Sequence, residues 1–275
     1  MDEFAKVALE AVGAAGRRLR AAWHEKKVVE YKGAVDLVTA TDRELEALIG
    51  DRLRAAFPEH LIIGEEAWTE TVERPDEQRL VWYLDPLDGT TNFAHSYPQF
   101  AVSLALARGT ELLLGIVHDP LRGETFMAQH GRGATLNGSK ICVSAASDLE
   151  RALLGTGFPY DRRENADFYL GFLKDFMVRA QGVRRVGSAA LDLCAVACGR
   201  LDGFWEWKLK PWDTAAGVLI VREAGGTATS FSGGPFDLYG EQTLASNGHL
   251  HAAMVQVLVE RLRQSSAEPG GLRTE

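Results

Sequence analysis

The stretch from Leu80 to Phe93 constrains the fold more than any other part of the sequence. It begins with an apolar run, Leu80-Val81-Trp82-Tyr83-Leu84, which predicts a buried strand. Asp85 and Asp88 follow directly, and Pro86 between them removes a backbone N–H and interrupts regular pairing. We therefore expect a core strand that carries two carboxylates out of the core on a stiff turn.

The residues after these aspartates are typical of a phosphate site. Gly89 allows a tight turn or a close approach of the backbone to a ligand, and Thr90 and Thr91 follow it with further N–H groups. Carboxylates beside such donors suit a hard cation next to a phosphate. An Asp-Gly step alone is ordinary turn chemistry. The second aspartate, the threonines and the preceding strand together favour a functional site.

Composition bounds the class of protein. The chain has 275 residues, 46% hydrophobic and 25% charged, which suits one large domain or two closely packed halves. The net charge of −8 argues against direct nucleic-acid binding, but not against phosphate substrates, because a metal inverts the local charge. We predict one catalytic domain over residues 1–264, with halves at about 1–150 and 151–264, and a disordered tail over 265–275.

The cysteines and the N-terminus indicate the compartment. Cys142, Cys194 and Cys198 show neither zinc-finger spacing nor a disulfide framework. The last two stand four residues apart among alanines and leucines, which predicts helix packing. No signal-peptide pattern and no apolar run of membrane-spanning length is visible. We expect a cytoplasmic protein that does not bind membranes.

Periodicity and turn signals predict a mixed order of helices and strands. Helices are expected over 2–22, 41–57, 165–179 and 249–263, with two more that end near Gly199 and Gly225. Strands are expected at 61–63, 80–84, 100–107, 112–117, 123–128, 134–136, 201–205, 227–231 and 242–245, and residues 153–157 predict a strand that leads into a glycine turn. Asn137-Gly138 predicts a hairpin turn, and residues 69–78 a mobile surface loop.

Six acids follow buried strands or begin helices: Asp42, Glu65, Asp85, Asp88, Glu206 and Asp213. Each has a structural explanation alone: Thr41 and Glu44 match a capping box around Asp42, and Asp213 stands where an N-cap would be. If several converge, these explanations fail together, because clustered carboxylates stay ionised only beside cations. Oxygen ligands without His or Cys select Mg²⁺, Mn²⁺ or Ca²⁺ over zinc. Two Mg²⁺ ions about 3.5–4 Å apart would clamp a phosphate and activate a water.

The chain resembles the inositol monophosphatase family of Mg²⁺-dependent, lithium-sensitive phosphatases over all but its tail. The run from Trp82 to Phe93 matches the family's first signature, and the run from Trp212 to Gly226 matches the second. Shorter matches occur in order at Asp36–Asp42, Gly64–Glu66 and Gly187–Ala190. The resemblance implies a layered α-β-α-β-α sandwich of the inositol monophosphatase and fructose-1,6-bisphosphatase type, an α+β or α/β fold, usually as a homodimer.

The resemblance also implies a metal centre. Glu65, Asp85 and the carbonyl of Leu87 would hold one Mg²⁺. Asp85, Asp88 and Asp213 would hold a second, and a looser third ion would depend on Glu65. Mn²⁺ would serve as an alternative ion, and Ca²⁺ or Li⁺ would inhibit.

Catalytic and supporting roles follow from the same resemblance. Thr90, tied to Asp42, would help deprotonate the attacking water, so the implied catalytic residues are Glu65, Thr90 and Asp42. Glu66 would support the metal ligands. The reaction would release phosphate from inositol 1-phosphate without a covalent phosphoenzyme.

The implied substrate contacts join the phosphate and polyol ends of the ligand. Backbone N–H groups of Gly89 and Thr90 would bind the phosphate, and Glu206 would contact the polyol. The full implied set is Glu65, Leu87, Asp88, Gly89, Thr90, Arg184, Gly187, Ser188, Ala189, Glu206 and Asp213.

One stretch departs from the family's pattern. The run from Glu206 to Pro211, which includes Trp207 and Lys208, is bulkier and more basic than the small-residue versions typical of the family. It leaves the substrate open, because relatives with nearly the same motifs act on fructose bisphosphate, histidinol phosphate, NADP or adenosine bisphosphate.

Two other functions are alternatives. A covalent mechanism with Asp85 as the nucleophile is disfavoured, because dehalogenase-like phosphatases need Asp-x-Asp near the start of the domain. Some bacterial relatives also act as partners in transcription complexes, so a protein-binding role with incidental activity stays open.

Overall fold

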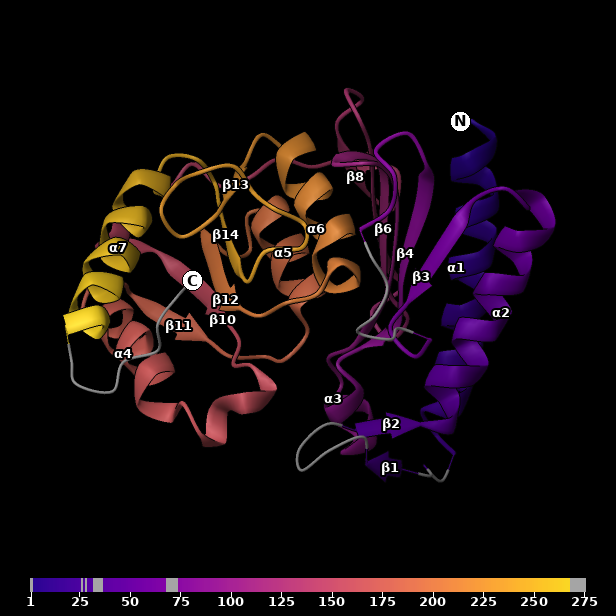
Figure 1. The fold of residues 1–275 in the computed structure, drawn as a ribbon, viewed down its shortest axis with the longest axis horizontal. Coiled ribbons are helices and arrows are strands. Elements are labelled where there is room, and N and C mark those ends of the chain that lie inside the picture. The colour runs from indigo at the N-terminus through magenta and orange to yellow at the C-terminus, as the bar shows by residue number, and fades with distance from the viewer. Residues whose placement is uncertain (1, 26, 28, 32–36, 68–73, 268–275) are drawn as a thin grey trace.

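The structure is a computed structural model that describes residues 2–25, 27, 29–31, 37–67 and 74–267. Asp36, residues 69–73 of the predicted loop and residues 268–275 of the predicted tail lie outside this part of the chain. The described residues form a seven-stranded sheet, a five-stranded sheet and a small pair of strands, β1 (Val29–Tyr31) and β2 (Leu37–Thr39) (Figure 1).

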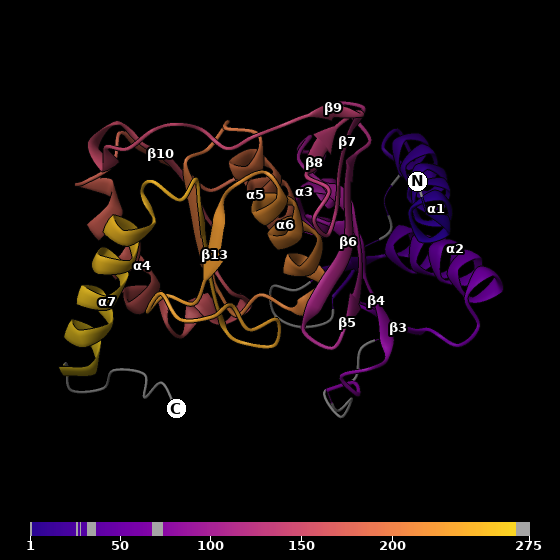
Figure 2. The ribbon, with the colours of Figure 1, turned by 90° about the horizontal axis from the view of Figure 1, so that it is seen from above.

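The seven-stranded sheet lies between two helical layers. Its strand order is β3-β4-β5-β6-β7-β8-β9. The helices α1 (Glu3–Ala22) and α2 (Ala40–Ala56) pack on one face, and α5 (Ala189–Ala197) and α6 (Pro211–Glu223) pack on the other (Figure 2). The strands are β3 (Leu61–Gly64), β4 (Leu80–Asp88), β5 (Ala101–Arg108), β6 (Glu111–Asp119), β7 (Glu124–Gln129), β8 (Ala134–Leu136) and β9 (Ser139–Lys140).

The five-stranded sheet shares the layer of α5 and α6. Its strand order is β11-β10-β12-β14-β13. The helices α4 (Ala166–Met177) and α7 (His251–Ala267) cover its other face, so five layers alternate as α-β-α-β-α (Figures 1 and 2). The remaining elements are β10 (Leu153–Thr156), β11 (Gly182–Arg184), β12 (Gly203–Trp207), β13 (Thr227–Thr229), β14 (Gln242–Ser246), α3 (Thr90–Ala94), η1 (Leu149–Arg151) and η2 (Tyr160–Arg163).

Burial on both faces explains the continuous apolar run of β4. Successive side chains of a strand point to opposite faces. Val81 and Tyr83 pack in the core with α5 and α6, whereas Trp82 and Leu84 pack in the core with α1 and α2. The predicted buried strand is therefore confirmed.

None of the described helices combines the length and apolarity that membrane crossing requires.

Several predicted boundaries are wrong, for local reasons. Strand β4 continues past Leu84 to Asp88, because a bulge between Asp85 and Asp88 absorbs the proline. Glu206 lies within β12 rather than after it. Helix α7 runs to Ala267, past the predicted start of the tail.

The predicted helix caps are also displaced. The capping box of α2 joins Thr39 to Asp42, rather than Thr41 to Glu44, because the helix begins at Ala40. Asp213 is the third residue of α6 rather than its N-cap, and its carboxylate accepts the backbone N–H of Lys210 at 2.7 Å. The hairpin turn at Asn137-Gly138 is confirmed, with φ of 50° and 80° between β8 and β9.

Candidate active site

The first signature places two aspartates and a turn at the end of β4. Asp85 and Asp88 are 2% and 8% exposed. Gly89 has a φ of 96°, and a Cβ there would lie 2.9 Å from the carbonyl oxygen of Gln99, so only glycine fits. The turn starts α3 directly beside both carboxylates.

Hydrogen bonds from distant segments fix the carboxylates. Asp85 Oδ1 accepts the backbone N–H of Leu87 at 2.8 Å. Asp88 Oδ2 accepts the Ser188 hydroxyl at 2.6 Å and the backbone N–H of Ala190 at 2.8 Å. The start of α5, about 100 residues away, therefore meets the end of β4, and its dipole favours the anion there.

Four acids come together at this place. β3 and β4 run parallel, with Gly64 beside Leu84, so Glu65 follows the end of β3 next to Asp85 of β4. Burial raises the pKa of Asp85 well above its usual range, and the negative charges of Glu65, Asp88 and Asp213 raise it further. Burial also raises the pKa of Asp88 to about 6, although its hydrogen bonds from Ser188 and Ala190 oppose the shift.

The donor chemistry of this cluster fits a hard divalent ion. The side chains offer only carboxylate oxygens, and the Leu87 carbonyl lies beside them, 3.0 Å from the Thr90 hydroxyl. Among the described residues, no three His, Cys, Asp or Glu side chains are arranged to hold an ion as they stand. Ligation therefore requires the neighbouring carboxylates to rotate toward the ion.

The predicted pair of Asp42 and Thr90 is in contact. The Thr90 hydroxyl lies 3.0 Å from Asp42 Oδ1, and Thr39 donates to the other oxygen through its backbone N–H at 2.8 Å and its hydroxyl. Burial raises the pKa of Asp42, opposed by these hydrogen bonds. One buried residue thus caps α2 and orients the first residue of α3.

Glu206 lies at the other end of the cluster. Burial raises its pKa to about 8, Arg185 opposes the shift, and Asp213 and Asp88 add to it. A Cβ at position 157 would overlap the Glu206 carboxylate, so Gly157 makes room for it. Ser188 and Ala189 donate hydrogen bonds to Asp88, and the Gly187 carbonyl oxygen lies beside Gly89.

The structure places Arg185, rather than Arg184, near Glu206. Arg184 ends β11, is exposed, and donates to the carbonyl of its own neighbour Val183 at 3.3 Å. Arg185 is the cation whose positive charge lowers the pKa of Glu206. Adjacent residues of an extended chain point to opposite sides, so an offset of one residue decides which arginine faces the acids.

The bulky residues that depart from the family's pattern turn away from the acids. Trp207 packs against Phe168, Phe172 and Phe231 on the outer face of the five-stranded sheet. Lys208 has a φ of 59° and pairs with Asp161 at 2.8 Å. Neither contact directs these side chains toward Glu206.

Sequence reasoning missed two residues that join the site. The Asn92 amide donates to the carbonyls of Gln99 at 2.7 Å, Val186 at 2.8 Å and Gly187 at 3.2 Å, which ties α3 to the segment before α5. The second is Asp192, which is 3% exposed in α5. An acid within an otherwise apolar helix is the sequence signal that could have marked it as a functional residue.

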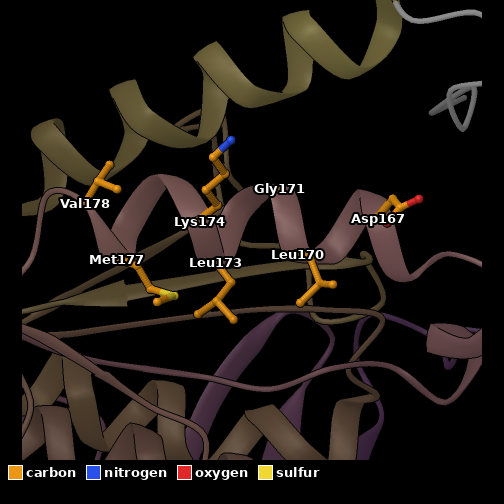
Figure 3. A pocket seen from close by; sticks show the side chains of 7 residues that line it. All are labelled: Asp167, Leu170, Gly171, Leu173, Lys174, Met177 and Val178. Atoms are coloured by element: carbon orange, nitrogen blue, oxygen red, sulfur yellow. The ribbon is translucent and has the colours of Figure 1, made fainter.

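Two further features lie outside the acid cluster: the turn after β3 and a hollow on α4. The backbone N–H of Glu66 donates to Glu46 Oε2 at 2.9 Å, which fixes the turn after β3. A hollow on α4 is lined mainly by apolar side chains, with Asp167 and Lys174 beside it (Figure 3). It contains none of the clustered acids.

Comparison with known proteins places this geometry in a family. A profile of the "Inositol monophosphatase family" matches residues 1–263. The chain is 44% identical over 260 residues to an "Inositol-1-monophosphatase" of Synechocystis, covering 94% of this chain and 89% of that protein. It is 42% identical over 269 residues to a "Putative Nus factor SuhB" of Neisseria meningitidis, covering 97% and 99%.

Solved structures match the five-layer fold. An inositol monophosphatase from Anabaena has a TM-score of 0.84 at 40% identity, covering 94% of this chain and 95% of that one. An IMPase from Thermotoga maritima has a TM-score of 0.85 at 36% identity, covering 96% and 99%. The expected fold class is confirmed, and the chain belongs to the inositol monophosphatase family, whose phosphatases generally depend on Mg²⁺.

Proposed function

We propose that this protein is a Mg²⁺-dependent phosphomonoesterase that releases phosphate from inositol 1-phosphate. The observation that carries the proposal is the crowding of Glu65, Asp88 and Asp213 around Asp85. Burial raises the pKa of Asp85 well above its usual range, and these charges raise it further. Such crowding costs stability unless cations compensate it. A site of this kind suits a substrate that arrives with a phosphate.

The residues that would hold the ions follow from this arrangement. Glu65, Asp85 and the Leu87 carbonyl would hold one ion, and Asp85, Asp88 and Asp213 a second, with a looser third ion at Glu65. When bound, the ions would polarise the phosphate, activate a water and stabilise the leaving oxygen.

The chain's own residues would orient the reactants. Asp42 accepts from the Thr90 hydroxyl at 3.0 Å, so the lone pairs of that hydroxyl are available to a water proton. The first N–H groups after Gly89 begin α3 and would bind phosphate oxygens. Glu206 and the start of α5, from Gly187 to Ala189, would contact the polyol.

A phosphate-release assay tests the proposal. The chain with Mg²⁺ should release phosphate from inositol 1-phosphate, and EDTA should abolish it. The Asp88→Asn variant should stay folded and lose at least about 100-fold in kcat. Asp167→Asn, the same charge change on the exposed face of α4, should keep full activity. Full activity of Asp88→Asn, or of the wild type in EDTA, would contradict the proposal.

The same assay decides the substrate. A panel of both inositol 1-phosphate enantiomers, fructose 1,6-bisphosphate, histidinol phosphate, NADP and adenosine 3′,5′-bisphosphate should show one preferred substrate. We propose an inositol 1-phosphate, because Trp207 and Lys208 have partners outside the acid cluster. Preference for any other member would replace this assignment.

The family resemblance supports three finer proposals. We infer a homodimer that works in the cytoplasm. Mn²⁺ would support activity in place of Mg²⁺, and Ca²⁺ or Li⁺ would inhibit it. Light scattering and the phosphate-release assay with each ion test these points.

A second candidate function rests on the names of the Neisseria relatives, "Putative Nus factor SuhB". The protein would then also bind transcription factors through its surface, independently of catalysis. Asp88→Asn should retain such partners in a pull-down from native extract. Failure of both wild type and variant to retain any transcription factor would contradict this function.

A further inference from the structure

Asp192 is a buried acid for which the proposed reaction gives no role. It lies in the first turn of α5 and is 3% exposed. Its carboxylate accepts no hydrogen bond from any residue that the structure describes, in contrast to Asp42 and Asp88. Burial raises its pKa well above the usual range, and the charges of Glu206 and Asp88 raise it further.

The space around Asp192 is formed by two glycines. Gly155 and Gly157 stand two residues apart at the end of β10, so both face the same side of the sheet. A Cβ at position 155 would lie 3.5 Å from Asp192 Cγ, and one at position 157 would overlap the Glu206 carboxylate. The two acids therefore lie next to each other at the end of β10, where Leu201 and Phe204 also pack against Gly155.

The Glu206 carboxylate, like that of Asp192, accepts no hydrogen bond from the residues that the structure describes. Its raised pKa has burial and neighbouring charges as causes, and no hydrogen bond opposes the shift. Carboxyl oxygens that no protein donor satisfies can accept hydrogen bonds from a bound molecule, so a ligand that supplies donors would be favoured there.

The charge around this pair is unbalanced. Arg185 is the cation that opposes the shifts of both acids, and it forms an ion pair with neither of them in the described part of the chain. One exposed guanidinium thus faces two carboxylates, and Asp88 adds negative charge from the metal side. Above about pH 8, where Glu206 ionises despite its raised pKa, a second anion on the ligand would meet net repulsion here.

We propose that Asp192 is a specificity-determining residue at the leaving-group end of the site. Beside Glu206, its carboxylate disfavours substrates that carry a second anionic group and favours leaving groups rich in hydrogen-bond donors. This inference rests on the proposed phosphatase function.

The test compares two substrates in wild type, Asp192→Asn and the surface control Asp167→Asn. The measured quantity is kcat/KM for fructose 1,6-bisphosphate divided by kcat/KM for inositol 1-phosphate, at saturating Mg²⁺ and at pH 8.5, above the pKa of Glu206. In Asp192→Asn this ratio should rise by about tenfold or more, and in Asp167→Asn it should match wild type. The melting temperature of Asp192→Asn should equal or exceed that of wild type, because the change replaces a buried carboxyl group that lacks donors by a neutral amide.

Two results would overturn the inference. The first is an unchanged ratio in Asp192→Asn. The second is a lower melting temperature with equal losses on both substrates, which would assign Asp192 to the fold alone. If the wild type releases phosphate from neither substrate, the proposed function itself fails, and this inference fails with it.

Discussion

Single acidic residues at this site make structural hydrogen bonds and would also serve the proposed metal centre. Asp88 uses one oxygen to accept from Ser188 and Ala190, and Asp213 uses one to hold the first turn of α6. Asp42 caps α2 and contacts Thr90. Each of these acids therefore has a structural role, although Asp42 and Asp213 fill other cap positions than predicted, and that role does not exclude a functional one.

Comparing alanine substitutions at Gly89 and Gly131 separates the cost of a steric clash from that of backbone strain, because both glycines have a positive φ. Gly89→Ala places a Cβ 2.9 Å from the Gln99 carbonyl oxygen at a φ of 96°, whereas Gly131→Ala has a φ of 69° and nothing within 4 Å. Urea unfolding should show Gly89→Ala less stable by about 1–3 kcal/mol beyond Gly131→Ala. Phosphate release should fall only in Gly89→Ala. Equal stability and activity of the two variants would contradict the predicted close packing of this turn.

Glu206 should make stability depend on pH in the presence of EDTA. Its folded pKa is raised to about 8, so between roughly pH 4 and 8 the folded chain binds more protons at this group than the unfolded chain. The free energy of unfolding should therefore fall as pH rises from 5.5 to 8.5. Glu206→Gln should reduce this fall by about 1–3 kcal/mol, measured by urea unfolding at both pH values. An identical pH dependence in wild type and variant would show that Glu206 is not desolvated as described.

At the scale of elements, the site forms where strand ends meet helix starts. β3 and β4 deliver Glu65 and Asp85 together, while α5 and α6 present their first turns to the same place. Asn92 links these elements, because its one amide donates to carbonyls on both sides of the contact between α3 and the segment before α5.

Loss of this link should weaken both stability and catalysis. Asn92→Ala leaves the carbonyls of Val186 and Gln99 without their donor, so unfolding in urea should show a loss of about 1–3 kcal/mol. The kcat for phosphate release should fall as well, because Ser188 and Ala190 then lose their position beside Asp88. Gln256→Ala, which removes an exposed contact within α7, should change neither. Wild-type kcat in Asn92→Ala would contradict the positioning role.

The elements themselves were predictable to the extent that their signals are local. Apolar runs and Asn137-Gly138 predicted strands and a hairpin that the structure confirms. Ends were less predictable, because the bulge after Asp85 and the shifted cap at Thr39 depend on tertiary partners. The contact between the start of α5 and Asp88 was not predicted, since nothing in the spacing reports a contact across 100 residues. The family resemblance implied only that Gly187, Ser188 and Ala189 contact the substrate.

The choice of arginine shows where the resemblance stops. A motif transfers residue identities, whereas the direction of a side chain depends on local backbone geometry. Arg184 and Arg185 are adjacent in the sequence, and it is Arg185 whose charge acts on Glu206 and Asp192. A role for Asp192 could not be predicted from periodicity, because periodicity indicates only that α5 is buried.

At the scale of the whole molecule, five layers bring distant acids to one place. The central layer of α5 and α6 lies between both sheets and supplies residues to the end of β4 (Figure 2). The net charge of −8 is then compatible with an anionic substrate only through the cations that the cluster would bind. The central claim is that these acids form a Mg²⁺ centre.

Calorimetric titration of Mg²⁺ into wild type and Asp85→Asn tests that claim most directly, since Asp85 would be shared by both ions. The account predicts Mg²⁺ binding by the wild type, a rise in its melting temperature with Mg²⁺ and the loss of both in Asp85→Asn. Equal Mg²⁺ binding by the two proteins, or none by the wild type, would contradict it.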